Sequence, residues 1–168
     1  FLTDGEFLRS LRNTVIFSLG KLALQFPTAI ILALALNELR HARIKKLYQT
    51  VFTFPHFISW VVMAGILKNM FASNGVINQL LTVWGMDAIS PLLSKTGFRP
   101  FIWFSNIWKE AGWDTIIYMA ALAGIDPGLY EAAEIDGANR WRKIWHITLP
   151  GIRSTILIML ILEIGRIM

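Results

Sequence analysis

One stretch of the sequence, YEAAEIDGANRWRKIWHITLPGI at positions 130–152, concentrates charged, aromatic and small residues between two apolar runs. Its acidic side chains are Glu131, Glu134 and Asp136. Ala132 and Ala133 form a small face that another backbone can approach closely. Trp141 and Trp145 lie four apart and therefore share one helix face, where they suit either a membrane interface or a protein partner. These residue types predict a contact surface.

Local signals divide this stretch into two short helices. Pro127, just before this stretch, favours the start of a helix, and Gly137 ends or bends that helix. Asn139 is a good N-cap for a second helix, which we predict over Arg140–Ile147. Pro150 then stands one or two residues before the next predicted span. The expected structure is a helix-turn-helix at a membrane surface.

A second candidate set lies on a helix predicted over residues 101–125. Its members follow an i, i+3, i+7, i+10 pattern and are Trp103, Asn106, Glu110 and Trp113. Aromatic rings stack on sugars, and amide and carboxylate oxygens accept hydroxyl hydrogen bonds, so this stripe is a candidate translocation path. The alternative is a packing stripe in which Glu110 pairs with a cation. Lys21 is the better expected partner, because Lys109 is adjacent in sequence and points elsewhere on the helix.

Motifs for catalysis and metal binding are absent from the sequence. It contains no G-x-x-x-x-G-K-[ST], H-E-x-x-H or G-x-S-x-G pattern and no cysteine. The three histidines, His41, His56 and His146, are scattered over different predicted elements. We therefore expect no catalytic residue, no metal site and no cofactor in this chain.

The composition favours lipid as the solvent. Of the 168 residues, 55% are hydrophobic, and the mean hydropathy of +0.52 is too high for an ordinary soluble domain. In a membrane protein the net charge of +5 is explained first by the orientation of the spans. No nucleic-acid partner is expected. The fold class predicted is all-α, a polytopic transmembrane helical bundle.

Four apolar segments are predicted as spans, within one transmembrane domain over residues 1–168. They cover approximately 13–36, 51–71, 101–125 and 152–168. The last is apolar only from Thr155 onward and reaches about 21 Å, short of a ~30 Å hydrocarbon core. The sequence is therefore expected to be an internal fragment of a longer protein. Residues 1–12 are expected to form a separate short interfacial helix.

The charges between these spans predict their orientation. The loop over residues 37–46 and the loop over residues 126–150 are both rich in arginine and lysine, whereas residues 72–99 hold few cations. By the positive-inside rule, the two basic loops are cytoplasmic and the connection over residues 72–99 is external. The number of spans between the two basic loops agrees with this assignment. A short helix is expected within the external connection.

The spacing of seven residues in the 130–152 stretch is specific. They are Glu131, Ala132, Ala133, Gly137, Ile147, Leu149 and Pro150. This pattern resembles the EAA motif of the permease subunits of binding-protein-dependent ABC importers. The phrases GIDPGLYEAAEIDGANRW and FPHFISWVV further resemble the sugar-importer branch of that family. Within it, the nearest likeness is to the permeases for polysaccharides or oligosaccharides such as aldouronates.

The resemblance implies a function for the whole chain. It implies a type I importer permease in a bacterial plasma membrane, multi-pass and surrounded by lipid, with a cytoplasmic coupling helix pair onto which ATPase subunits dock. Those subunits, not this chain, would bind ATP and magnesium and hydrolyse the nucleotide. The further implied partners are a second permease subunit and an extracytoplasmic solute-binding protein.

Two other classes of protein are alternatives to this interpretation. An ion-gradient-driven secondary transporter or channel would use Glu110 and Asp114 as a relay, but it leaves the 130–152 stretch unexplained. A membrane-embedded enzyme would need a catalytic constellation, which the sequence lacks.

Overall fold

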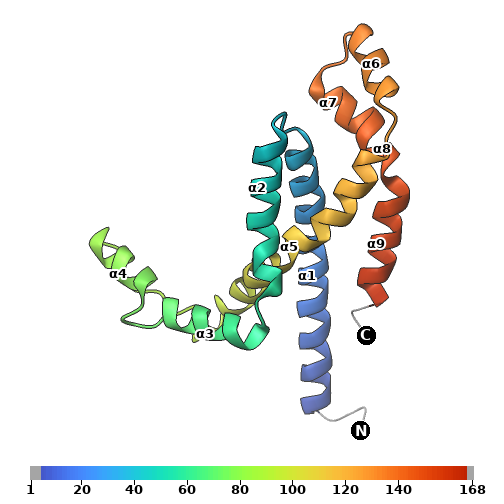
Figure 1. Cartoon of the computed structure of the whole chain (residues 1–168). Helices are drawn as coiled ribbons and strands as arrows, with labels where there is room; N and C mark the ends of the chain where they lie inside the picture. The colour runs from blue at the N-terminus through green and yellow to red at the C-terminus, as the bar shows by residue number, and fades with distance from the viewer. Residues whose placement is uncertain (1–4, 166–168) are drawn as a thin grey trace.

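The computed structural model describes residues 5–165, and every regular element within that range is helical (Figure 1). In chain order the elements are α1 (Gly5–Asn37), α2 (Ala42–Thr53), η1 (Phe54–Phe57), α3 (Trp60–Met70), α4 (Val76–Val83), α5 (Phe98–Ala123), α6 (Pro127–Ile135), α7 (Arg140–Lys143), η2 (Ile144–Thr148), α8 (Leu149–Gly151) and α9 (Arg153–Gly165). The all-α expectation agrees with this architecture. Residues 166–168, the end of the predicted last span, lie outside the described residues.

Helix α1 is longer than the predicted first span of 13–36. Its 33 residues extend over about 50 Å. The separate helix expected over residues 1–12 is wrong for the described part of that segment, since residues from Gly5 onward already belong to α1. No glycine or proline occurs between Gly5 and Gly20 to interrupt the helix. The helix also continues through Pro27, and Thr28 donates its hydroxyl to the Leu24 carbonyl.

The segment predicted as the second span, 51–71, is not one helix. Helix α2 ends at Thr53, the 3-10 turn η1 follows, and α3 leaves at 100° to the preceding pair. Pro55 lies in this turn, where it has no backbone N–H to continue the α-helical pattern. Ser59 then caps α3 by accepting a hydrogen bond from the Val62 amide at 3.3 Å. The break is therefore encoded locally.

The core lies where α1, α5 and α9 meet, with α5 crossing α1 obliquely (Figure 1). Its buried residues are Ala29, Ala33, Tyr118, Leu122, Ile152 and Met159. The two alanines are one turn apart on α1, and their small side chains let α5 approach closely. Thr115 of α5 donates its hydroxyl to the Ala29 carbonyl across this contact at 3.1 Å.

Helix α2 also approaches α5 closely. A β-carbon built on Gly112 would lie 2.0 Å from the Phe52 carbonyl oxygen, so only glycine fits at this position. Thr53 donates its hydroxyl to the Gly112 carbonyl at 3.3 Å across the same contact. The α2–α5 packing therefore brings backbone against backbone.

The arm formed by α3 and α4 projects away from the bundle (Figure 1). Helix α4 is the short helix expected within the connection over residues 72–99. Asn78 is buried and holds the loop after it, because its amide donates to the carbonyls of Ala72 and Ile89 and its oxygen accepts from the Ile89 amide. A single polar side chain thus ties two turns of the connection together.

Among the described residues, α1 is the one helix long and apolar enough to cross a membrane. Two bent pairs bring the number to three if each counts as one broken span: Ala42–Phe57 with Trp60–Met70, and Arg140–Gly151 with Arg153–Gly165, the latter bent by 61°. Helix α5, the predicted third span, carries Lys109, Glu110 and Asp114 in its middle. Many large apolar side chains on the described surface are exposed, as Ile31 and Ile161 are, which suits a lipid environment.

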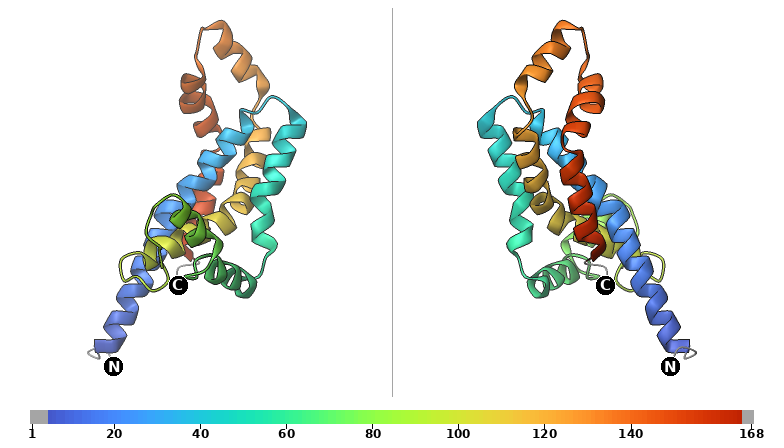
Figure 2. Two further views of the ribbon diagram at one scale, coloured as in Figure 1. Left: turned by 90° about the vertical axis from the view of Figure 1, so that its left-hand side faces the viewer. Right: turned by 90° about the vertical axis from the view of Figure 1, so that its right-hand side faces the viewer.

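The two basic loops lie toward the same end of the molecule. Figure 2 shows the α1–α2 connection and the α6–α7 pair at one end, with α3 and the start of α1 toward the other. This arrangement matches the relation that the charges predict for residues 37–46, 126–150 and 72–99.

Candidate functional site

Helix α6 begins and ends at the residues that its sequence signals specify. Asp126 is the N-cap and accepts a hydrogen bond from the Gly128 amide at 2.9 Å, and Pro127 occupies the first turn. At the other end, Gly137 has a φ of 73°, the left-handed region. The amides of Gly137 and Ala138 donate to the carbonyls of Glu134 and Ala133, which is the Schellman arrangement. The predicted turn at Gly137 is therefore present.

The second helix of the pair differs in detail from the one expected over Arg140–Ile147. Asn139 caps it as predicted, accepting from the Arg142 amide at 2.9 Å. After Lys143, however, the chain widens into the π-helical turn η2 and continues through Pro150 to Gly151. The wider turn precedes Pro150, which lacks the N–H that would continue the α-helical pattern. Such turns are frequent at functional sites.

The seven motif positions are distributed over one outer face and one groove. Glu131, Ala132, Gly137 and Pro150 are exposed, whereas Ala133, Ile147 and Leu149 are partly buried. A groove of about 300 Å³ runs between the helices and is lined by Ala133, Ala138, Arg142, Lys143, His146 and Ile147. The structure thus brings together two motif residues, Ala133 and Ile147, that are far apart in the motif. The outer face also exposes Trp141 (71%) and Trp145 (65%).

The two acidic residues on α6 differ in their partners. Glu134 forms an ion pair with Lys143 at 2.7 Å. The hydrogen bond from Lys143, and then its charge, lower the pKa of the Glu134 carboxyl below its usual value. Within residues 5–165, Glu131 forms no ion pair and no side-chain hydrogen bond. Its carboxylate is available to a partner.

The predicted stripe on α5 contacts two different neighbours. Trp103 donates its indole N–H to the Phe17 carbonyl on α1 at 3.2 Å, and Asn106 donates to Gln25 on the same helix. Glu110 and Trp113 instead face the turn between α2 and α3. Trp113 is 41% exposed, and its ring stacks on that of His56 at 4.3 Å between centroids. All four members of the stripe therefore contact a neighbouring helix or turn, and Trp113 is the one among them whose side chain is still exposed.

The expected pairing of Glu110 with Lys21 is wrong. Glu110 lies 2.7 Å from Nδ1 of His56 and 3.3 Å from Nζ of Lys109. Lys109, which the sequence interpretation directed elsewhere, is only 4% exposed and donates to the His56 carbonyl at 2.7 Å. Its ammonium also lies 5.4 Å from the centre of the Trp60 ring. The side chains of Lys109 and Glu110 converge because both reach His56 at the α2–α3 break, Lys109 its backbone carbonyl and Glu110 its imidazole.

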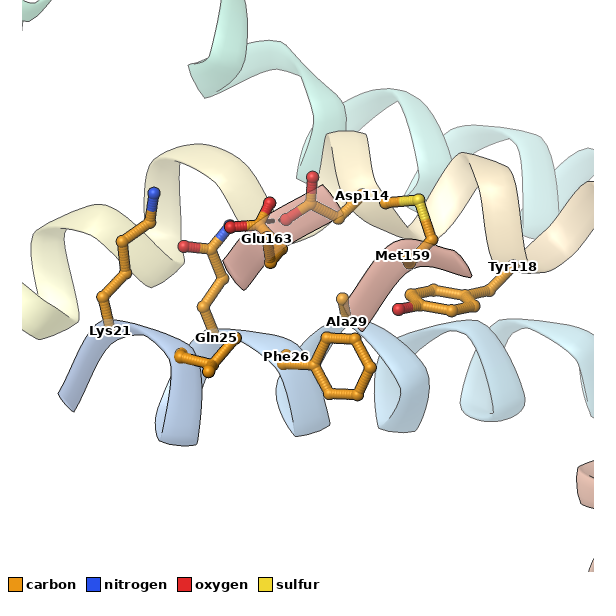
Figure 3. A pocket seen from close by; sticks show the side chains of 9 residues that line it. Lys21, Gln25, Phe26, Ala29, Asp114, Tyr118, Met159 and Glu163 are labelled. Carbon is orange, nitrogen blue, oxygen red and sulfur yellow. Dashed lines mark hydrogen bonds between the residues drawn. The ribbon is translucent and has the colours of Figure 1, made fainter. Parts of the chain in front are cut away.

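A polar cluster between α1, α5 and α9 was missed at the level of sequence. Gln25 donates to Asp114, and Glu163 reaches the same place from α9 (Figure 3). Lys21 and Tyr118 also line this small cavity, whose volume of about 10 Å³ is close to that of one water probe. The signal was available, since Gln25 and Glu163 interrupt otherwise apolar runs. Among the described residues, no group of histidine and acidic side chains could hold a metal ion.

The Lys109–Glu110 contact gives a testable stability effect. Glu110→Gln removes the charge but can keep a hydrogen bond to His56, so the buried Lys109 ammonium loses its carboxylate partner and keeps only the His56 carbonyl and the Trp60 ring. We expect a loss of about 2 kcal/mol, measured as a lower Tm of the full-length permease in detergent. The double variant Lys109→Met with Glu110→Gln is expected to recover most of this loss.

The matched control for that double variant is Lys21→Met with Glu110→Gln. Since Lys21 is not the partner, this control should be at least as unstable as the single Glu110→Gln variant. Recovery in the Lys21 double variant, and not in the Lys109 one, would contradict the observed pairing.

Residues 25–168 match the family described as the binding-protein-dependent transport system inner membrane component. The match covers most of the sequence, and the chain belongs to this family. The resemblance carried by the EAA-like spacing is thereby confirmed at the level of the family.

Curated relatives show which members of this family are similar to the chain. Over 164 residues the chain is 47% identical to the polygalacturonan/rhamnogalacturonan transport system permease protein YteP of Bacillus subtilis (strain 168), covering 97% of this chain and 51% of that protein. It is 48% identical over 166 residues to Protein LplB of the same organism, covering 98% and 52%. The chain therefore spans about half the length of these curated relatives.

A solved structure shares the fold. A chain from the crystal structure of the bacterial alginate ABC transporter, in complex with an alginate pentasaccharide-bound periplasmic protein, superposes with a TM-score of 0.95 at 42% identity. The comparison covers 99% of this chain and 58% of that chain. The prediction of an all-α fold of the type I importer permease kind is confirmed.

Proposed function

We propose that this chain is part of the permease subunit of an ATP-driven ABC importer for oligosaccharides or polysaccharide fragments. The observation that carries the proposal is the capped helix pair α6–α7, which exposes the available Glu131 carboxylate at one end of the bundle. Membership of the inner membrane component family supports it. The names of YteP and of the alginate transporter support the substrate class.

In this proposal the α6–α7 pair is the docking surface for an ATPase subunit. The seven motif residues form the contact: Glu131, Ala132, Ala133, Gly137, Ile147, Leu149 and Pro150. Glu131 would accept charge-assisted hydrogen bonds from a basic cleft, and the alanines would allow close approach. ATP and magnesium are bound by the ATPase partner, so this chain is a translocation subunit and not an enzyme.

The remaining partners are also part of the proposal. A second permease subunit would complete the pathway, an extracytoplasmic solute-binding protein would deliver the sugar, and membrane lipid would cover the exposed apolar side chains. The periplasmic protein in the alginate transporter complex supports the binding-protein partner. For the translocation path we retain Trp113 alone, because its side chain is exposed although it stacks on His56, whereas Trp103, Asn106 and Glu110 are partly buried in contacts with neighbouring elements.

The proposed location is the bacterial plasma membrane, with both basic loops in the cytoplasm and the α3–α4 arm outside. The chain has no cysteine, so single cysteines can report this topology without background from this segment. Of Arg43→Cys, Gly85→Cys and Asn139→Cys, only the Gly85 variant should react on intact cells with an impermeant thiol reagent. Reaction at Asn139→Cys would reverse the topology and remove the basis for ATPase docking.

The test of the function itself is reconstitution of the full-length permease with its ATPase and binding protein in vesicles. Uptake of a labelled oligogalacturonate should require ATP and should persist when an ionophore collapses the ion gradients. The competing ion-gradient transporter predicts the reverse result.

A further inference from the structure

Two hydroxyl groups join α6 to η2, the π-helical turn that follows α7. The hydroxyl of Tyr130, on α6, lies 3.0 Å from Oγ1 of Thr148, the last residue of η2. The Thr148 hydroxyl also lies 3.3 Å from the Lys143 carbonyl, to which it donates. Since a threonine hydroxyl has one proton, Tyr130 must be the donor to Thr148. The direction of the contact is therefore fixed.

This hydrogen bond is better protected from water than the ion pair that also connects α6 with the second helical segment. Thr148 is 4% exposed and Tyr130 is partly buried. That ion pair joins Lys143 to Glu134, and the side chain of Glu134 is 66% exposed. Exposed ion pairs contribute little to rigidity because solvent and salt screen them. The Tyr130–Thr148 hydrogen bond is thus the stiffer connection.

Thr148 connects directly to the core. The amide of Ile152 donates to the Thr148 carbonyl at 3.2 Å. Ile152 is fully buried in the cluster formed by α1, α5 and α9, and α9 begins at the next residue. A displacement of α6 therefore reaches α9 by a short route, from the Tyr130 ring through Thr148 to Ile152.

We propose that Tyr130 and Thr148 are the positioning residues that transmit movement of the docked helix α6 to α9. The inference rests on the proposed function, because it assumes that an ATPase subunit moves α6. It adds a contact within this chain that acts after docking. Neither hydroxyl has to touch the ATPase or the sugar for the contact to work.

The experiment measures sugars transported per ATP hydrolysed in the reconstituted full-length complex. Tyr130→Phe removes this hydrogen bond with almost no change of volume and should lower the ratio roughly fivefold. Thr148→Val removes the same bond and also the one from Thr148 to the Lys143 carbonyl, so it should lower the ratio at least as much. Thr148→Ser keeps the hydroxyl and should stay near the wild-type ratio. Combining Tyr130→Phe with Thr148→Val should be no worse than Thr148→Val alone. Glu134→Gln, which breaks only the exposed ion pair, should leave the ratio unchanged.

Co-purification of the ATPase and the Tm of the complex separate transmission from docking and folding. Both should be unchanged in Tyr130→Phe. A wild-type ratio in Tyr130→Phe overturns the inference, and so does loss of the ATPase subunit, since the pair would then belong to the docking surface. A wild-type complex without ATP-driven uptake would instead contradict the proposed function itself.

Discussion

Replacing Gly112 by alanine is expected to prevent correct packing of α2 on α5. The new β-carbon would lie 2.0 Å from the Phe52 carbonyl oxygen and 2.8 Å from the Thr53 amide nitrogen. Both are backbone atoms, so no side-chain rotation relieves the clash. The helices must separate, and the hydrogen bond from Thr53 to the Gly112 carbonyl is lost with the contact. We expect a destabilisation of about 3 kcal/mol, seen as a lower Tm and a lower yield of folded full-length permease.

Gly65→Ala provides the control for Gly112→Ala. Gly65 also lies inside a helix, α3, but a β-carbon there meets nothing within 4 Å. Alanine is the better helix former, so this change should be neutral or stabilise by about 0.5–1 kcal/mol. Equal melting temperatures for Gly112→Ala and wild type would show that α2 and α5 do not meet as observed.

Reversing the charge of Glu131 is expected to abolish ATPase binding and uptake. Glu131→Lys places a cation where the proposed basic cleft would dock, so attraction becomes repulsion. The helix should still form, because Glu131 forms no ion pair and no side-chain hydrogen bond within residues 5–165. We expect at least a tenfold loss of ATPase co-purification, with the permease still inserted in the membrane. The readouts are the amount of ATPase recovered with tagged permease and the rate of sugar uptake.

Two further variants test whether the loss is specific to Glu131 and whether docking takes place at this loop. Glu134→Gln changes an acid one turn away on the same helix, but its carboxylate is already paired with Lys143, so ATPase recovery should stay near normal. Gly137→Leu introduces a side chain at a φ of 73°, which costs about 1–2 kcal/mol in a non-glycine residue. The turn should distort and uptake should fall. Normal uptake in both Glu131→Lys and Gly137→Leu would refute docking at this loop.

The loop was predictable because its structure is set by neighbouring residues. The start at Pro127, the turn at Gly137 and the cap at Asn139 are each present, since proline fixes φ, glycine tolerates positive φ and a short amide caps a helix. These preferences act within four residues. The π turn at Ile144–Thr148 was not expected, although Pro150, which lacks a backbone N–H, lies two residues after it.

The partners of the α5 side chains were decided by the tertiary structure. Periodicity placed Glu110 on a polar stripe, but His56 and Gln25, which contact that stripe, are 54 and 81 residues away from their partners Glu110 and Asn106. Lys109 appeared unsuitable as a partner of Glu110 by helix geometry alone. It became one because the α2–α3 break exposes the His56 carbonyl, toward which a long lysine side chain can turn.

The sequence by itself determined the helical class, the membrane-like composition, the family and the capped loop. Each follows from residue type or from spacing over a few turns. The fold decided which helix faces meet, including the backbone contact at Gly112 and the Tyr130–Thr148 link. Such contacts depend on the angles at which distant helices cross, and those angles are fixed only when the small residues of α1 and α5 pack together.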